Sequence, residues 1–177
     1  ANPYPSVIDW KAASGWSNRE SRLAASGGGY NIWIWNQAGQ NYGAFNTAMD
    51  ENDPDFTPVL QVGRYISAMQ GFWVKAATHN ENISIGNDTR VHRPNTLWLK
   101  NNASPTQSLH LAVSMDTREW RDETLVQFGH NADQGGAEKM FSSNPGAPSL
   151  YTVKQGENYT ISFLTSTHDH KAVPLHF

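Results

Sequence analysis

The sequence contains no cysteine, so the chain has no disulfide, no thiolate metal site and no cysteine nucleophile. Charged residues are also scarce, at 16% of 177 residues, and the formal net charge is −3. Binding to nucleic acid needs a concentrated positive field, so this charge excludes nucleic acid as a general partner. The longest apolar stretches, such as Ile32 to Trp35, are too short to predict a membrane span.

Aromatic and neutral polar side chains take the place of charge. Aromatic residues make up 11% of the chain and include seven tryptophans, while Asn, Ser, Thr and Gly together make up about a third of it. This composition disfavours helices and is typical of extracellular β-rich modules. The length suits one domain spanning residues 1–177, with enough chain to bury a core.

Short runs of alternating, β-branched or aromatic residues predict strands separated by turn residues. The predicted strands are 30–36, 71–76, 82–85, 96–100, 108–113, 124–128, 159–164 and 172–177. Turn chemistry lies between them, for example at 27–29 and 155–157. Many short strands at roughly even spacing predict an all-β fold, specifically a two-sheet jelly-roll-like β-sandwich.

One short helix is predicted near the N-terminus. Ser17 and Glu20 have the spacing of a capping box, with Ser17 as the N-cap. Residues 21–25 allow two helical turns before the glycines at 27–29 end the helix.

Several segments resemble a known family because of the order in which they occur. They are NPYPSVIDW at 2–10, IWIWN at 32–36, NYG at 41–43, MQGFWVKA at 69–76, RVH at 90–92, DETLVQF at 122–128, AEKM at 137–140 and VPLHF at 173–177. Together they resemble a β-sandwich module found near the C-termini of large secreted proteins of bacteria that use type IX secretion, commonly just upstream of the sorting domain. The resemblance covers nearly the whole chain, although residues 131–136 are richer in glycine than the corresponding family segment.

The resemblance implies an extracellular accessory module and supplies no catalytic residues. The chain starts inside the first motif and stops at a strand-like end, so we expect it to be excised from a larger protein. The leading prediction is therefore a non-catalytic module of a secreted or cell-surface bacterial protein. Two roles compete within this class, polysaccharide binding and a structural spacer that contacts neighbouring domains.

Polysaccharide binding needs exposed aromatic rings that stack on sugars, with polar neighbours for the hydroxyl groups. Trp10, Trp33, Trp35 and Trp73 are expected to pack in the core or against the sheets, because they lie in strands or in a structural motif. The predicted site uses loop residues instead, namely Trp120 and Trp16 with Arg118, Arg121 and Asp122 as polar partners.

An enzyme acting on glycans, a hydrolase or a lyase, is the third alternative. A glycosidase needs two carboxylates about 5 to 10 Å apart, and Glu119, Asp122 and Glu123 are candidates beside Trp120. The sequence has no Gly-x-Ser-x-Gly elbow, no phosphate-binding loop before a helix and no His-Glu-x-x-His motif. We therefore predict that the chain is not an enzyme.

Metal binding has two weak candidates. His168 and His170 share a face of an extended chain, but no third ligand is visible in the sequence. Asp53 and Asp55, in the acidic segment 50–55, could bind calcium, but the spacing is not that of a helix-loop-helix calcium site. We predict no cofactor, with a structural calcium ion as the open alternative.

Overall fold

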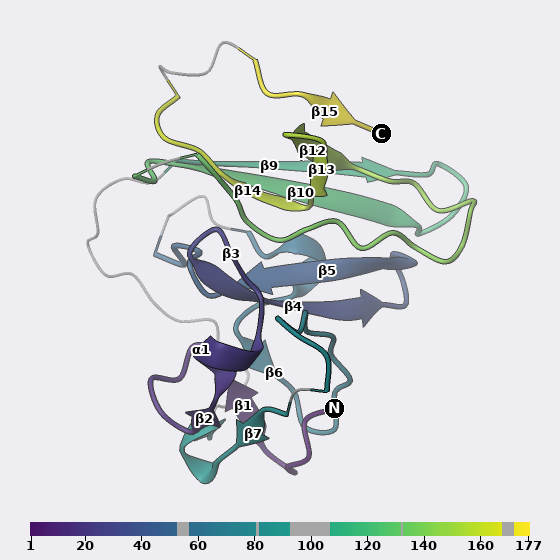
Figure 1. The fold of residues 1–177 in the computed structure, drawn as a ribbon. Helices are drawn as coiled ribbons and strands as arrows, with labels where there is room; N and C mark the ends of the chain where they lie inside the picture. The colour runs from purple at the N-terminus through teal and green to yellow at the C-terminus, as the bar shows by residue number, and fades with distance from the viewer. Residues whose placement is uncertain (53–56, 81, 93–106, 132, 168–171) are drawn as a thin grey trace.

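The computed structural model describes residues 1–52, 57–80, 82–92, 107–131, 133–167 and 172–177. Strands account for 40% of the structure and helices for 7%, so the predicted all-β class is confirmed. Within the described residues the strands form five small sheets. Figure 1 shows them arranged from the N-terminal strands at the bottom of the view to the C-terminal strands at the top.

The longest strands lie in a four-stranded sheet. Its order is β11 (Gln134–Gly135), β14 (Ile161–Phe163), β10 (Arg121–Phe128) and β9 (Gln107–Ser114). Strands β9 and β10 pair antiparallel along all eight residues of each, whereas β10 and β14 pair in parallel. Residues 122–127 are all buried, because β10 has a partner strand on each side and is covered on both faces.

A three-stranded sheet packs against it. This sheet contains β3 (Ala25–Ser26), β4 (Gly29–Asn36) and β5 (Asn41–Asn46). Figure 1 shows it as the layer beneath β9 and β10, and β5 contacts both β10 and β14. Side chains alternate along β4, so Trp33 and Ile32 point to opposite sides. Trp33 Nε1 reaches the chain that follows β11, where it donates a hydrogen bond to Glu138 O at 2.9 Å.

The N-terminal part consists of very short strands. Its strands are β1 (Val7–Asp9), which lies between β6 (Tyr65–Ile66) and β8 (Arg90–Val91), and the pair β2 (Trp16–Ser17) and β7 (Ser84–Ile85). The helix α1 (Arg19–Arg22) and the 3-10 turns η1 (Val59–Gln61) and η2 (Asn87–Thr89) complete this part. Buried Ile8, Trp10 and Ile66 join it to the same hydrophobic core as Phe45 and Leu125.

A small C-terminal sheet contains β13 (Glu157–Tyr159), β12 (Tyr151–Lys154) and β15 (Leu175–His176). Strands β12 and β13 are joined by a turn at Gln155 and Gly156, whose φ values are 53° and 86°. Two consecutive positive φ values characterise the tight two-residue hairpin turn, and the sequence predicted a turn here.

Four predicted strands differ within the described residues, and two of them are only shorter, because 82–85 is reduced to Ser84–Ile85 and 172–177 to Leu175–His176. In the segment 71–76 the pairing is limited to isolated bridges of Trp73 with Trp33 and of Ala76 with Leu23. The predicted strand 159–164 breaks at Thr160, because the chain passes there from pairing with β12 to pairing with β10. The predicted strand 96–100 lies outside the described residues.

The predicted capping box is wrong, although a helix forms nearby. Ser17 belongs to β2, and Asn18 is the N-cap, with φ 64° and no side-chain cap hydrogen bond. The Glu20 carboxylate accepts hydrogen bonds from Arg19 instead, at 2.8 and 3.1 Å. The helix ends after one turn because Leu23 is extended and bridges to residue 76.

Candidate functional site

The tryptophans of the described residues divide by exposure. They comprise buried Trp10, Trp16 and Trp33, partly buried Trp35 and Trp120, and Trp73 with 59% of its surface exposed. The expectation that Trp73 packs in the core or against the sheets is wrong for its side chain, although its backbone pairs with Trp33 of β4. Burial alternates along this segment, so Phe72 and Val74 pack against the core while Trp73 and Lys75 face outward.

Trp16 is buried, which corrects its prediction as an exposed sugar platform. Its ring packs edge-on against Trp10, with centroids 4.7 Å apart, and its Nε1 donates a hydrogen bond to Asp9 O at 2.9 Å. Only 7% of the residue is exposed. A ring in this position has no free face for a ligand, because the short N-terminal strands enclose it.

Trp120 lies where two hairpins meet. Arg121 N donates a hydrogen bond to Gly39 O at 3.1 Å, so the β9–β10 loop lies beside the β4–β5 turn. The guanidinium of exposed Arg118 stacks over the Trp120 ring, 4.1 Å from its centroid. Gly146 lies close to the same ring, since a Cβ there would come within 3.3 Å of Trp120 Cζ3. Trp120 is therefore half-buried, and a cation already covers one face.

Asp122 cannot act as a surface partner of Trp120, which corrects the predicted site. It has no exposed surface and contacts buried Lys139 instead. The carboxylates predicted as a possible glycosidase pair do not face one common site either. Asp122 and Glu123 are consecutive in β10, so their side chains point to opposite faces of the sheet. Glu119, by contrast, is exposed in the preceding loop.

Glu123 is occupied by contacts within the protein. Its Oε2 accepts a hydrogen bond from Leu60 N at 2.6 Å and contacts His110 Nε2 at 3.2 Å. Burial alone would raise the pKa of Glu123, but the hydrogen bonds from His110 and Leu60 and the charges of His110 and Arg121 lower it below its ordinary value. The residue is held as a carboxylate, which suits a structural role better than that of a general acid.

Trp73, Lys75 and Glu138 form an exposed aromatic and polar surface, which we call the Trp73 surface. The backbone of Trp73 exchanges two hydrogen bonds with Trp33, at 2.8 and 3.1 Å, which fixes its segment beside β4. Lys75 Nζ bonds both carboxylate oxygens of Glu138, at 2.5 and 2.7 Å. The Trp33 indole also binds the Glu138 backbone, so buried contacts hold the base of this surface.

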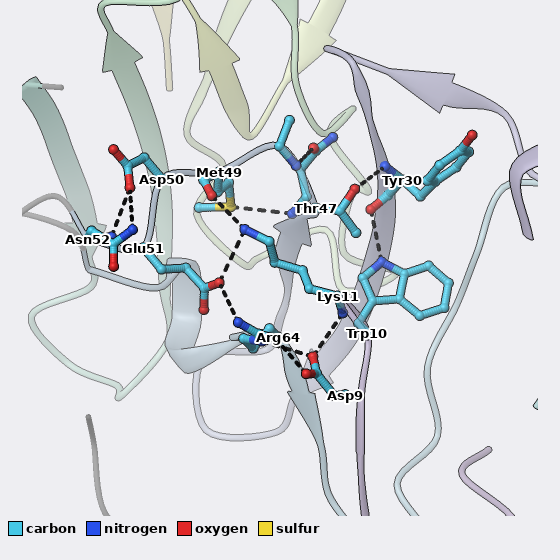
Figure 2. Close-up of polar contacts among 12 residues, drawn as sticks. Asp9, Trp10, Lys11, Tyr30, Thr47, Met49, Asp50, Glu51, Asn52 and Arg64 are labelled. Carbon is cyan, nitrogen blue, oxygen red and sulfur yellow. Dashed lines mark hydrogen bonds and ion pairs between the residues drawn. The ribbon is translucent and has the colours of Figure 1, made fainter. Parts of the chain in front are cut away.

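The acidic segment has internal partners, as Figure 2 shows. Glu51 forms ion pairs with Lys11 at 3.3 Å and Arg64 at 3.5 Å, and Asp50 Oδ1 accepts a hydrogen bond from Asn52 N at 2.9 Å. Figure 2 also shows Arg64 donating through Nε and Nη2 to the two carboxylate oxygens of Asp9, at 2.8 and 2.5 Å. Protein donors therefore engage the two acidic side chains of this segment that the structure describes.

The weak metal candidates Asp53, Asp55, His168 and His170 all lie outside the described residues. Among the residues that the structure does describe, no group of three or more His, Asp or Glu side chains is arranged to hold a metal ion. Nor does any helix of the described ranges have the length and apolar character needed to cross a membrane.

The chain matches no protein-family model, no curated protein and no solved structure. The resemblance to a module of type IX secretion proteins therefore stays a prediction, and the functional argument depends on the surface itself.

Sequence reasoning missed Lys75, Glu138 and Lys139 and misplaced Trp73. One signal was present, because Lys75 lies two residues after Trp73 and therefore shares its face on an extended chain. A lysine on one face of a strand indicates that this face is open to solvent. The partners at 138 and 139 had no comparable signal, since they are distant in the sequence.

Proposed function

We propose that this chain is a non-catalytic accessory module of a secreted or cell-surface protein and that it binds polysaccharide through the Trp73 surface. The observation that carries the proposal is the 59% exposure of Trp73 on a segment fixed by backbone hydrogen bonds. Tryptophan is enriched at binding surfaces, because its ring offers a large apolar face beside a polar N–H. Its ring is available for stacking on a sugar face.

The neighbours of Trp73 supply the polar half of such a site. Lys75 is a hydrogen-bond donor and Glu138 an acceptor, and both are at least partly exposed, with 51% and 35% of their side-chain surfaces accessible. Sugar hydroxyl groups can donate and accept, so this ion pair can bind a hydroxyl without leaving either charge unpaired. The Trp120 surface is a weaker candidate, because Arg118 already covers one face of its ring.

We also propose how the two largest sheets are arranged. We infer a two-sheet sandwich made of the four-stranded sheet and the β3-β4-β5 sheet, and the contacts of β5 with β10 and β14 support it. The parallel pairing of β10 with β14 is a departure from an all-antiparallel jelly roll. Secretion, and a position beside a sorting domain in a type IX secretion protein, are supported by the ordered motifs and by the aromatic, neutral-polar composition with few charged residues.

Affinity gel electrophoresis against soluble plant and algal polysaccharides tests the binding site. We expect retardation of the native chain by at least one polysaccharide and a roughly tenfold weakening by Trp73→Ala, since stacking contributes about 1 kcal/mol or more. Phe141→Ala is the matched control, because Phe141 is also an exposed aromatic, at 49%, outside the Trp73 surface. Its retardation should equal that of the native chain.

Three outcomes would contradict the proposal in different ways. Loss of retardation with Trp120→Ala but not with Trp73→Ala would place the site at the hairpin end. Equal loss with Trp73→Ala and Phe141→Ala would indicate nonspecific apolar binding. A folded native chain that is not retarded by any polysaccharide would favour the structural spacer.

A further inference from the structure

A lysine and an aspartate contact each other in the interior of the protein. Unlike the exposed Lys75 and Glu138 of the Trp73 surface, both side chains are buried. Lys139 Nζ contacts Asp122 Oδ2, and neither side chain has any exposed surface. Asp122 is fixed by the ladder of β10. Lys139 is fixed separately, because its backbone N donates a hydrogen bond to Asn158 O at 2.8 Å.

An ordinary ion pair is poorly suited to this position. An ammonium group carries three N–H donors, and within the described residues Asp122 is the one acceptor that Lys139 Nζ has. Burying two charges costs several kcal/mol each unless further hydrogen bonds compensate. Burial raises the pKa of the Asp122 carboxyl and lowers the pKa of Lys139. The attraction between the two groups opposes both shifts, and the backbone hydrogen bonds from Leu150 and Glu123 also oppose the rise at Asp122, but burial is the larger cause in each case. Burial therefore favours the neutral acid and the neutral amine.

We propose that Lys139 and Asp122 become joined by an intramolecular isopeptide bond after the chain has folded. The lone pair of the neutral Lys139 Nζ attacks Asp122 Cγ and forms a C–N bond. One carboxyl C–O bond breaks, and that oxygen leaves as water with its own proton and one proton from Nζ. The product is a neutral secondary amide with a single N–H, and no oxidant or reductant is required.

The surroundings of Asp122 favour this reaction. Leu150 N donates a hydrogen bond to Oδ2 at 2.6 Å, and Glu123 N donates one to Oδ1 at 2.9 Å. Two backbone donors polarise the carboxyl group and stabilise the negative charge that develops on oxygen during attack. A desolvated lysine is also a better nucleophile than an exposed one. Exclusion of water from the site protects the finished amide from hydrolysis.

The chain has no cysteine and therefore no disulfide, so this bond would be its covalent cross-link. It would close the loop between residues 122 and 139, which links β10 to the chain that pairs beside β13. A cross-link of this kind stabilises a protein mainly by restricting the unfolded chain. Unlike a disulfide, it would be insensitive to reducing agents.

Intact-protein mass spectrometry of the purified chain tests the proposal without any variant. We expect a mass lower than that calculated from the sequence by one water molecule. Lys139→Arg, whose protonated guanidinium cannot form this amide, should show its full calculated mass. A native chain at its full calculated mass would overturn the proposal.

Proteolysis followed by tandem mass spectrometry locates the bond. We expect a branched peptide that contains Asp122 and Lys139, together with loss of trypsin cleavage after Lys139. The exposed Lys75–Glu138 pair is an internal control, because it makes similar contacts in solvent and should give linear peptides. A water loss located elsewhere, such as a cyclised aspartate, would also overturn the proposal.

Discussion

The four-stranded sheet and the β3-β4-β5 sheet that packs against it, which we call the facing sheets, are held together differently from the N-terminal part of the molecule. Strands β4, β9 and β10 have eight residues each, and backbone ladders satisfy most of their polar groups. The strands of the N-terminal part have two or three residues, and side chains complete the hydrogen bonding there. Buried Asn2, for example, donates through Nδ2 to backbone oxygens of Ser6, Ile66 and Ser67 at 2.8 to 3.1 Å.

The comparison shows what polar and aromatic residues contribute to a chain with few long strands. Trp10 and Trp16 fill the N-terminal part of the core and also donate hydrogen bonds to Tyr30 O and Asp9 O, both at 2.9 Å. Asp9 binds Arg64 and thereby links β1 to the chain before β6. Single side-chain substitutions should therefore disturb the N-terminal part locally, whereas the facing sheets should respond as one unit.

Trp10→Ala should have the largest effect. The substitution empties a fully buried site and removes the hydrogen bond to Tyr30, so we expect the free energy of opening of the N-terminal part to fall by about 3–5 kcal/mol. Hydrogen exchange should show loss of protection in β1 and β6 while β9 and β10 stay protected. Phe163→Ala, equally buried in the facing sheets, is the matched comparison. If both variants lower protection uniformly, the two parts do not differ in cooperativity.

Arg64→Met should have an intermediate effect. The change keeps the apolar stem but leaves the Asp9 carboxylate, whose side chain is only 10% exposed, without its bidentate partner. Arg64 is itself 28% exposed, so we expect a loss of about 2 kcal/mol in denaturant unfolding, less than for a dry ion pair. Lys75→Met, which breaks an exposed ion pair, should cost less than about 1 kcal/mol. Equal losses for the two variants would contradict this role of Asp9 and Arg64.

Glu123→Gln should have the smallest effect, and that effect should depend on pH. The pKa of Glu123 in the folded protein lies below its ordinary value of 4.5, so the carboxylate adds stability at neutral pH. This contribution is lost as the pH falls below 4.5 through the folded pKa. We expect a loss of about 1 kcal/mol at pH 7 that shrinks below that range, measured by urea unfolding. A stability loss for Glu123→Gln that stays constant with pH would contradict this prediction. Glu119→Gln, at an exposed position, is the control and should leave the stability nearly unchanged at every pH.

The sequence correctly predicted the strands that have several residues of alternating or β-branched pattern, and one turn with characteristic residue types. Strands β4, β9 and β10 follow runs of alternating, β-branched or aromatic residues, and the turn at Gln155 and Gly156 follows from its residue types. Strand β5 was missed because Asn41–Asn46 reads as a polar, glycine-containing segment, although most of it is buried. The two-residue strands carry no periodicity, so their partners come only from tertiary contacts.

The candidate site was less predictable for the same reason. The charged residues on both sides of Trp120 suggested that the whole segment is an exposed loop. Arg118 is indeed exposed, but Asp122 is buried because strand β10 already begins at Arg121. Trp73 looked buried because Phe72 and Val74 are apolar neighbours, yet its own face is the open one. The contact of Asp122 with Lys139 connects two segments whose approach no local pattern indicates.

The parallel pairing of β10 with β14 has a consequence for the order of folding. Strand β9 is joined to β10 by a short loop, so that hairpin closes at little entropic cost. Strand β14 reaches β10 only after the chain has passed through β11, β12 and β13, and such non-local contacts are slow to form. We therefore expect pulse-labelling hydrogen exchange during refolding to find β9 and β10 protected first and β14 later. Until β14 docks, one edge of β10 is left open to pair with another chain, so refolding at high concentration is the condition under which this protein is most prone to aggregate.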